Sequence, residues 1–600
     1  MSEGGRDGAQ AAGGPGEQAA HGGTLAVAAA RRHGVQTMFT LSGGHVFPLY
    51  DGAVKADPPV RIVDVRHEQT AVFAAEATAR LSRAPGLAVL TAGPGVTNGV
   101  SAITTAHFNG SPVVVLAGRA PDYRWGSGSL QEIDHPALVQ AVTKRAWTEH
   151  ETARVGPAVD DAFRLAAARH RGPVFLDMSP EALFGTAGPA HPAPRTGSGE
   201  RGSSVAAGQG AGSAILGADE PGQGAHRADG PPGADEPDPA AVAKIAGLLA
   251  RASRPVLVLG SDVWLDGAHQ AAREAAEALT LPVVANGQGR GILPAGHELL
   301  VTRARSIAFG QADLVIVAGT PLDFRLAYGQ FGGKDGTPQA QVVHVADAPA
   351  QLATHRELAA AASGSLVAFF TQLAAEASPR PQAPGWAADW LPRLAGAAQQ
   401  AVAADAALLA SDADPIHPMR VYGELARVLD PDAVVIGDGG DFVSYAGNYI
   451  EPQRPGGWLD PGPYGCLGTG LGYAIAARIA RPSAQVVLLL GDGAAGFSLM
   501  DADSLVRHNL PVVMICGNNG IWGLEKHPMQ AIYGYDVAAD LQPRCRYDQV
   551  VTALGGAGEL VTRPEDIAPA LRRAFGSGAP YLVNVATDPK VCYPRSTTGF

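Results

Sequence analysis

The chain has 600 residues and a formal net charge of −12, from 45 basic and 57 acidic side chains. This length exceeds what one hydrophobic core usually holds, so we expect three domains. The acidic balance, without a concentrated block of lysine and arginine, argues against a nucleic acid partner. No apolar run approaches the length of a membrane span, and the N-terminus shows no secretory signal. We expect a cytoplasmic protein that binds no membrane, with its four cysteines reduced.

The first 240 residues divide into three parts by composition. Residues 1–22 are rich in Gly, Ala and Gln without an apolar period, which is typical of a disordered tail. From residue 23 to residue 183, short apolar strands alternate with alanine-rich helices, which predicts a doubly wound α/β domain. Residues 184–236 are dominated by Gly, Pro, Ser and Ala, which predicts a flexible linker.

The remainder of the chain predicts two further α/β units. The central domain is expected at residues 237–376, followed by a connector with Pro and Trp at 377–411. The C-terminal domain is expected at residues 412–600. The predicted fold class is therefore α/β, with three doubly wound parallel-sheet domains.

Two short motifs follow neighbouring apolar strands in the C-terminal domain. Residues 486–490 read as a buried parallel strand that ends at Gly491-Asp492-Gly493. Residues 512–516 read the same way and lead to Asn518-Asn519. Open α/β sheets bind ligands at the carboxyl ends of their strands, so Asp492 and Asn519 are expected at one edge. A carboxylate and an amide oxygen there suit Mg²⁺ carrying phosphate groups.

The helix after the first motif adds an anion site. Gly493 and Ala494 open this helix, whose free N–H groups and dipole favour a phosphate. A GDG motif followed about thirty residues later by NN resembles the signature of the thiamine diphosphate enzymes. Alone, GDG is also compatible with an ordinary strand-to-helix turn.

The N-terminal domain carries a second, independent resemblance. Glu68 follows the strand-like residues 61–65 and begins a helix, and residues 87–98 form a strand that runs into a glycine-rich turn. With Gly43 and Gly44 in the first strand-to-helix loop, these stretches resemble the pyrimidine-binding domain of the acetolactate synthase branch. The chain is identified as a member of the acetolactate synthase-like family. The three domains are then a pyrimidine-binding, a central and a diphosphate-binding domain.

The resemblance implies roles for two side chains in catalysis. In this family the cofactor removes its own C2 proton, and this needs a hydrogen-bond donor at N1′ of its pyrimidine. Glu68 matches that donor, and its alternative role is that of a carboxylate at a helix start. Gln131 matches a family glutamine that points into the active site, with helix capping as the alternative. His45 could assist proton transfer or serve as a hydrogen-bonded loop histidine.

The resemblance also implies the residues that hold the cofactor and its metal. Gly465 would offer a carbonyl to the aminopyrimidine, and Leu467 would wedge between the two rings unless it belongs to the core. Ile521 would supply a backbone carbonyl as the third metal ligand. The expected metal ligands are Asp492, Asn519 and Ile521. The expected contacts to thiamine diphosphate are Gly43, Gly44, Pro94, Asn98, Gly439, Gly440, Asp441, Phe442, Gly465, Leu467, Gly493 and Ala494.

The central domain departs from the acetolactate synthase pattern. The stretch from Gly319 to Leu326 aligns with the segment that contacts FAD in those enzymes, but Pro321 replaces an arginine. A proline offers neither charge nor a stacking plane. Asp323 and Arg325 remain, either as a binding pair or as a structural ion pair. Two occupants are open for this domain, FAD and an adenine nucleotide such as the CoA moiety.

A second departure bears on the reaction. Acetolactate synthases carry a tryptophan at the position of Pro528, where it shapes the pocket for the second 2-oxo acid. The preferred function is acetolactate-synthase-like decarboxylation and carboligation of 2-oxo acids. The alternative is a 2-hydroxyacyl-CoA lyase that yields an aldehyde and formyl-CoA. A thiamine diphosphate-binding protein without turnover is disfavoured, because Glu68, Asp492 and Asn519 are all present.

The family resemblance also implies an assembly. Glu68 and Asp492 lie in different domains, and in this family the cofactor bridges those domains across two subunits. A homodimer or homotetramer with active sites at the subunit interface is expected.

Overall fold

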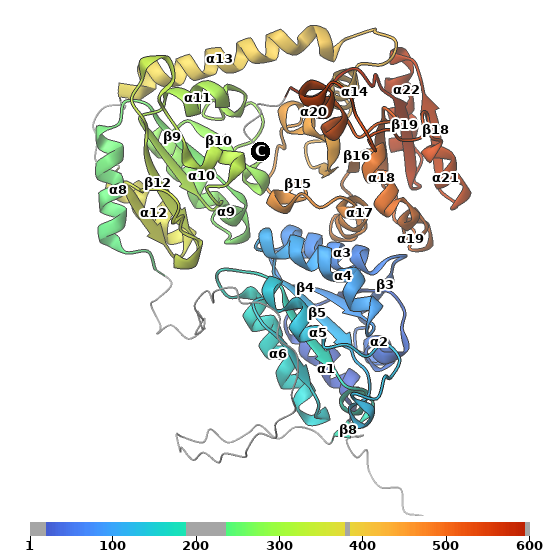
Figure 1. Ribbon diagram of the computed structural model, residues 1–600. Coiled ribbons are helices and arrows are strands. Elements are labelled where there is room, and N and C mark those ends of the chain that lie inside the picture. Colours follow the sequence, from blue (N-terminus) through green and yellow to red (C-terminus); the bar gives the residue numbers. More distant parts are fainter. Residues whose placement is uncertain (1–19, 188–235, 378–384, 595–600) are drawn as a thin grey trace, which may run out of the picture.

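The computed structural model describes residues 20–187, 236–377 and 385–594. Within these ranges, three parallel sheets flanked by helices follow one another along the chain (Figure 1). The expected α/β fold class is confirmed. The expected tail and linker lie outside the described residues, apart from a short antiparallel pair formed by β1 (Ala20–His21) and β8 (Thr186–Ala187). No helix in the described ranges is long and apolar enough to span a bilayer.

The first domain has a six-stranded sheet in the order β3-β2-β4-β5-β7-β6. Its strands are β2 (Thr37–Thr40), β3 (Arg61–Asp64), β4 (Gly86–Leu90), β5 (Val113–Gly118), β6 (Ala146–Glu149) and β7 (Val174–Met178). Its helices are α1 (Gly22–Arg32), α2 (Phe47–Lys55), α3 (Glu68–Ser82), α4 (Pro94–Phe108), α5 (His135–Val139), α6 (Thr152–Ala167) and α7 (Pro180–Phe184). The inner strands are buried on both faces, as parallel strands between two helical layers must be.

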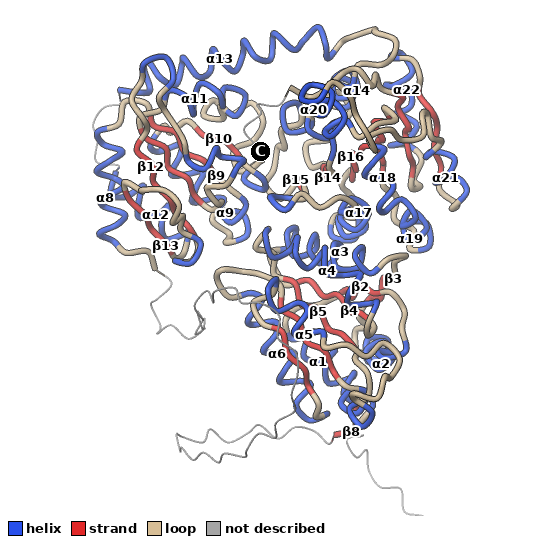
Figure 2. Tube along the Cα trace, viewed as in Figure 1, coloured by secondary structure: helices blue, strands red, loops and turns tan. Residues whose placement is uncertain are grey.

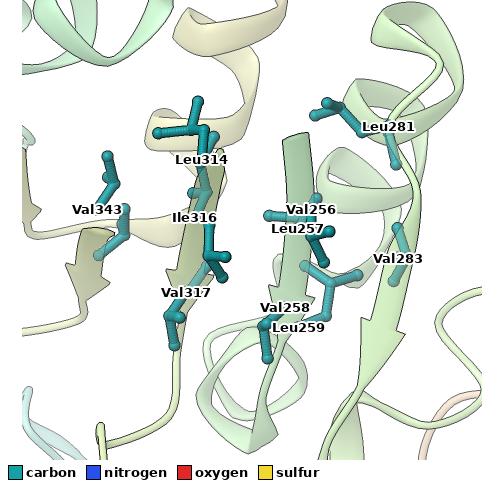
Figure 3. Packing of buried hydrophobic residues seen from close by; sticks show 14 of the residues in the cluster. Val256, Leu257, Val258, Leu259, Leu281, Val283, Leu314, Ile316, Val317 and Val343 are labelled. Carbon is teal, nitrogen blue, oxygen red and sulfur yellow. The ribbon is translucent and has the colours of Figure 1, made fainter. Parts of the chain in front are cut away.

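The central domain has a five-stranded sheet in the order β10-β9-β11-β12-β13. Its strands are β9 (Pro255–Leu259), β10 (Val283–Ala285), β11 (Leu314–Ala318), β12 (Gln341–Ala346) and β13 (Ala360–Ser363). Its helices are α8 (Pro239–Arg251), α9 (Ser261–Leu265), α10 (His269–Leu279), α11 (Arg305–Gln311) and α12 (Leu366–Ala377). Branched side chains from adjacent strands fill its core (Figure 3). Helix α13 (Gly385–Leu409), within the expected connector, runs from this domain to the third (Figure 2).

The third domain has a six-stranded sheet in the order β15-β14-β16-β17-β19-β18. Its strands are β14 (Val434–Asp438), β15 (Trp458–Leu459), β16 (Val486–Gly491), β17 (Val513–Asn518), β18 (Ala557–Val561) and β19 (Tyr581–Ala586). Its helices are α14 (Pro418–Leu425), α15 (Gly440–Ser444), α16 (Ala446–Tyr449), α17 (Thr469–Ala480), α18 (Asp492–Ser498), α19 (Ala502–Arg507), α20 (Gly523–Tyr533), α21 (Tyr547–Ala553) and α22 (Pro564–Gly576).

Helices α3 and α17 join the first and third domains into one continuous core. They face each other between the two sheets (Figure 1). A Cβ on Gly472 would lie only 2.7 Å from Phe73 Cβ, so glycine permits this close approach. The rings of Phe73 and Tyr473 meet edge to face at 6.0 Å. Helix α3 is therefore buried on nearly every side, which fixes the position of its first residue, Glu68.

A buried arginine on α3 links all three domains. Arg80 donates to Asp460 O at 2.6 Å and to Tyr473 Oη at 3.2 Å in the third domain. It also donates to Gln288 Oε1 at 3.2 Å in the central domain. Its own carbonyl accepts the Trp264 indole N–H at 2.6 Å. Sequence analysis gave no sign of this junction, because its members are separated by hundreds of residues.

A cluster of titratable groups joins the first and central domains. His170 Nδ1 lies 2.8 Å from Asp347 Oδ1, and Asp262 completes a group whose polar atoms lie within 4.8 Å of one another. Burial, together with the nearby carboxylate of Asp347, raises the pKa of Asp262 to about 7 against the opposing effects of His170 and Arg171. In the folded protein, Asp262 therefore holds a proton at pH values where the unfolded chain has lost it.

The raised pKa of Asp262 predicts that the free energy of unfolding depends on pH. The raised pKa means that the contribution of Asp262 to stability is lost as pH rises from about 4 through about 7. Asp262→Asn removes the buried charge, so it should raise the free energy of unfolding at pH 8, relative to wild type, by on the order of 1–3 kcal/mol. The gain should shrink toward pH 5. Thermal unfolding at both pH values measures it, with exposed Asp389→Asn as the control. An equal effect at both pH values would contradict the assignment.

Candidate active site

The two third-domain motifs meet at one edge of the sheet. Strands β16 and β17 are parallel neighbours in which Gly491 pairs with Gly517, so Asp492 and Asn519 both follow their carboxyl ends. Asp492 is buried, and its Oδ2 accepts the Gly520 N–H at 2.6 Å. Its carboxylate therefore contacts the loop that carries Asn519, as the motifs predicted.

The donor set at this edge fits a hard cation. Burial raises the pKa of Asp492 to about 6, although backbone N–H groups of Gly520 and Gly493 oppose the shift. A buried carboxylate with no cationic side chain among these partners gains from a divalent ion. Asn519 Oδ1 currently accepts the Ile521 N–H at 3.2 Å, which places its amide oxygen beside the backbone of Ile521. Asp492, Asn519 and Ile521 thus lie on two adjacent loops that the hydrogen bond from Gly520 to Asp492 links.

The start of α18 is covered by a side chain that sequence analysis did not assign to the site. A Cβ on Gly493 would lie 2.4 Å from the Trp522 ring, so only glycine lets the indole cross this helix start. Ala494 is buried in the first turn. The GDG spacing gave no signal for Trp522. This residue follows the Asn-Asn motif, and only the fold of its loop brings the indole to the start of α18.

The loops after β14 and before α17 lie against each other. Gly439 has a φ of +52°, and a Cβ on it would lie 2.1 Å from Leu467 Cδ2. Gly440 also has a positive φ, of +92°, but a Cβ there would meet nothing within 4 Å. The first predicted diphosphate loop and the predicted wedge residue are thus neighbours. Gly465 is exposed with a φ of +70° at the start of the same loop.

Asp438 holds these two loops together, although sequence analysis did not select it. Its carboxylate accepts the N–H groups of Gly468 at 2.9 Å and Gly470 at 3.0 Å. Burial raises the pKa of Asp438 to about 6, while these N–H groups oppose the shift. Its position as the last residue of a buried strand was the available signal.

Two predicted cofactor contacts direct their side chains into the protein. Asp441 Oδ1 accepts the Tyr593 N–H at 2.9 Å. The Phe442 ring lies in the core, where a Cβ on Gly517 would approach it to 2.2 Å. The Phe442 carbonyl accepts the Tyr422 hydroxyl at 2.8 Å. Any contact of Phe442 with a ligand would therefore use its backbone, not its ring.

The first-domain residues form a second group. Glu68 is the first residue of α3, is 6% exposed, and accepts the Asn98 side-chain N–H on Oε2 at 3.0 Å. Asn98 lies in α4, which Pro94 begins. A Cβ on Gly95 would lie 3.8 Å from Glu68 Oε1. The glycine-rich turn therefore passes close to the Glu68 carboxyl, and the structure brings together Glu68, Pro94 and Asn98.

The two glycines of the first loop and Gln131 border the same turn. A Cβ on Gly43 would lie 2.3 Å from Thr91 Cβ, just before the turn, and exposed Gly44 starts the next helical turn. His45 Nδ1 lies 3.1 Å from Thr91 Oγ1, and burial lowers the pKa of His45. Gln131, whose own φ is +62°, lies against Gly93.

The first-domain and third-domain groups of site residues meet at Gln69, the residue after Glu68. Gln69 Nε2 donates to the Phe497 carbonyl at 3.3 Å and borders Gly468. Phe497 lies in α18, which the GDG motif begins. The structure thus places the start of α3 beside the third-domain site, while Glu68 itself bonds to Asn98.

A cluster of arginines lies where the central domain faces the third. Asp323 and Arg325 pair with each other at 2.7 Å, as the structural alternative for them anticipated. Burial, together with the nearby charges of Arg290 and Arg325, lowers the pKa of Arg305 to about 10. Arg290 reaches Glu451 of the third domain at 3.7 Å. Closely spaced, partly buried guanidinium groups favour binding of an anion such as a phosphate.

Comparisons with known proteins agree across the whole chain. Family models for thiamine pyrophosphate enzymes match residues 20–138 (N-terminal TPP binding domain), 242–373 (central domain) and 438–585 (C-terminal TPP binding domain). The chain is 46% identical to the acetolactate synthase large subunit IlvG of Mycobacterium tuberculosis, over 96% of this chain and 98% of that protein. It is 33% identical to 2-hydroxyacyl-CoA lyase 2 of Homo sapiens, over 94% and 90% of the two chains.

The contact between Gly439 and Leu467 yields a matched pair of variants. Gly439→Ala should weaken binding of thiamine diphosphate at least about tenfold, because its Cβ displaces Leu467 and both loops. Gly578→Ala, in the same domain but outside the predicted cofactor contacts, also adds a Cβ at a positive φ that meets no atom, so it should have a much smaller effect. Adding Leu467→Ala to Gly439→Ala should restore part of the affinity. Titration calorimetry measures all three, and equal losses in both glycine variants would contradict the prediction.

Proposed function

Because the chain belongs to the thiamine pyrophosphate enzymes, we propose that it decarboxylates a 2-oxo acid and joins the acyl group to an acceptor carbonyl. The observation that carries this proposal is 46% identity to an acetolactate synthase large subunit over nearly the full length of both chains. The chain is thus a thiamine diphosphate-dependent enzyme, and the acetolactate-synthase-like reaction is our proposal for its chemistry.

The proposed role of Glu68 is to hold a proton at N1′ of the cofactor pyrimidine. When bound, thiamine diphosphate supplies the nucleophilic carbon for carbon–carbon bond cleavage and formation. Glu68 begins a helix that is buried on nearly every side, and Asn98 fixes one of its two carboxyl oxygens. A rigid carboxyl of this kind keeps its position and loses little entropy when the cofactor binds. Gln131, which borders the same turn, would point its amide into the active site.

The proposed metal ligands are the side chains of Asp492 and Asn519 and the carbonyl of Ile521, with Mg²⁺ as the ion. The hard oxygen donors and the raised pKa of Asp492 favour this choice. The diphosphate would lie against the backbone at Gly493 and Ala494 and at the loop Gly439–Phe442. Leu467, which rests on that loop, would support the rings of the cofactor from one side.

A dimer is proposed as the functional unit, with active sites at the subunit interface. Large apolar side chains are exposed in the loop that carries Gln131, including Tyr123 at 74% and Leu130 at 80%. Others are exposed at the end of α20, such as Ile532 at 69%. These surfaces border the two groups of site residues, and apolar exposure of this kind favours a subunit contact.

A second candidate function is cleavage of a 2-hydroxyacyl-CoA into an aldehyde and formyl-CoA. Pro528 lies within α20, where the acetolactate synthase pattern has a tryptophan that shapes the acceptor pocket. The arginines Arg290, Arg305 and Arg325 would suit the phosphates of a CoA arm. The 33% identity to 2-hydroxyacyl-CoA lyases supports this alternative.

Removal of the metal ligands should abolish cofactor binding. Asp492→Ala and Asn519→Ala should each lose Mg²⁺-dependent affinity for thiamine diphosphate, because the diphosphate loses its bridging cation. Wild-type protein with EDTA should behave like these variants. Asp566→Ala, on a surface helix of the same domain, serves as the control. Unchanged affinity of both variants in titration calorimetry would remove the metal assignment.

Two assays distinguish the candidate reactions. With pyruvate, thiamine diphosphate and Mg²⁺, we expect carbon dioxide and acetolactate. With a 2-hydroxyacyl-CoA under the same conditions, we expect no aldehyde and no formyl-CoA. Mass spectrometry identifies the products of both assays. The reverse pattern, with no acetolactate from pyruvate but with aldehyde and formyl-CoA from the thioester, would make the lyase reaction the function. Arg305→Ala then reports on the CoA arm, since it should raise KM for the thioester and leave pyruvate turnover unchanged.

A further inference from the structure

A buried histidine–aspartate pair lies behind the glycine-rich turn of the first domain. His135 is the first residue of α5, and Asp177 lies in β7; neither side chain is accessible to solvent. His135 Nε2 lies 2.9 Å from the Gly93 backbone nitrogen, and Nδ1 lies 2.9 Å from Asp177 Oδ2. Neither residue belongs to the sites described above.

The geometry fixes the tautomer of this histidine. The backbone N–H of Gly93 can only donate, so Nε2 of His135 must carry a lone pair and accept. The single ring proton is therefore on Nδ1, where it is donated to the Asp177 carboxylate. A carboxylate that orients a neutral imidazole through Nδ1–H is a common arrangement where the second nitrogen has a defined task.

The task of His135 Nε2 is to hold the backbone N–H of Gly93. This residue joins β4 to α4 with a φ of +59°, and a Cβ on it would lie 2.7 Å from Gln131 Cβ. The helix that follows carries Asn98, which donates to Glu68. A shift of the Gly93 amide would therefore move both Gln131 and the group that orients Glu68.

Asp177 also acts on the loop that carries Gln131. Its second oxygen, Oδ1, lies 3.9 Å from Arg119 Nη1. The Arg119 guanidinium lies 3.9 Å from the centre of the Trp125 ring, and its Nη1 donates to Thr148 Oγ1 at 2.7 Å. The loop between β5 and α5 is thus fixed at one end through Arg119 and at the other through His135.

We infer that His135 is a positioning residue for the pyrimidine half of the cofactor site. As the Nδ1–H tautomer set by Asp177, it accepts the Gly93 N–H and so fixes the turn between Glu68 and Gln131. The inference rests on the proposed role of Glu68, and it extends that role to two residues that touch neither cofactor nor substrate.

Three variants test the inference. His135→Leu removes the acceptor, whereas His135→Gln can still accept from Gly93 through its amide oxygen and donate to Asp177. Asp177→Asn keeps the volume but allows the ring proton to move to Nε2, against the Gly93 N–H. The control is His33→Leu, which removes a histidine–aspartate contact at the far end of the same domain.

The measurements are kcat and KM for pyruvate, the affinity for thiamine diphosphate with Mg²⁺, and the circular dichroism bands of the bound aminopyrimidine. In His135→Leu and Asp177→Asn, kcat should fall about ten- to a hundredfold with KM within about twofold, and the imino band should weaken. His135→Gln should recover most of both signals, and His33→Leu should change neither. Asp177→Asn carries the test even where His135→Leu does not fold.

Normal kcat and a normal imino band in both His135→Leu and Asp177→Asn would overturn the inference. So would a loss confined to melting temperature, because a merely structural residue produces that result. Glu68→Gln separates this outcome from failure of the proposed function. Full turnover by Glu68→Gln would remove the premise, whereas its inactivity beside fully active His135 variants would overturn the positioning role alone.

Discussion

A buried charged network on α3, which reaches the third domain through Tyr473 and Asp460, is the constraint on which the active site depends. Arg80 and Glu76 are both buried, and Tyr473 hydrogen-bonds to each of them. Burial raises the pKa of Glu76, while Arg80 and three hydrogen-bond donors favour its carboxylate. Removing one partner of such a pair costs about 3–5 kcal/mol, because the other charge stays buried. The network therefore fixes the axis of α3 against α17, and Glu68 begins that same helix.

The remaining site residues follow from the same architecture. Parallel strands end at one edge, and the loops that carry Gly439 and Asp492 start where buried strands stop. Asp438 and Asp492 end adjacent strands or begin the turns after them, and both bind backbone N–H groups. Their carboxylates thus organise loops that have few side chains of their own. Glycines such as Gly439 and Gly493 let neighbouring side chains reach the backbone.

Sequence predicted the strands and the position of the GDG and Asn-Asn motifs at their ends, because both are local signals. A run such as Val486–Leu490 is apolar throughout, which is typical of a strand covered on both faces. The side chains that hold the site from behind could not be predicted in this way. His135 and Asp177 are ordinary residues in ordinary positions, and only the fold brings them to Gly93. Phe442 stays a predicted cofactor contact through its backbone, but sequence could not show that its ring packs into the core over Gly517.

We expect cofactor chemistry and substrate choice to depend on separate residues of this molecule. Several residues expected to hold the cofactor are packed against neighbours, since a Cβ on Gly439 would meet Leu467 and one on Gly493 would meet Trp522. Pro528 and Arg325 instead lie on α20 and on a loop facing the domain boundary, both partly accessible. Substitution at either position would not move a strand end, and under the proposed function both are candidates for substrate choice. Under the proposed function, one scaffold would keep its carbon–carbon chemistry while the acceptor changes, so Pro528 and Arg325 would carry more information about the reaction than the shared motifs do.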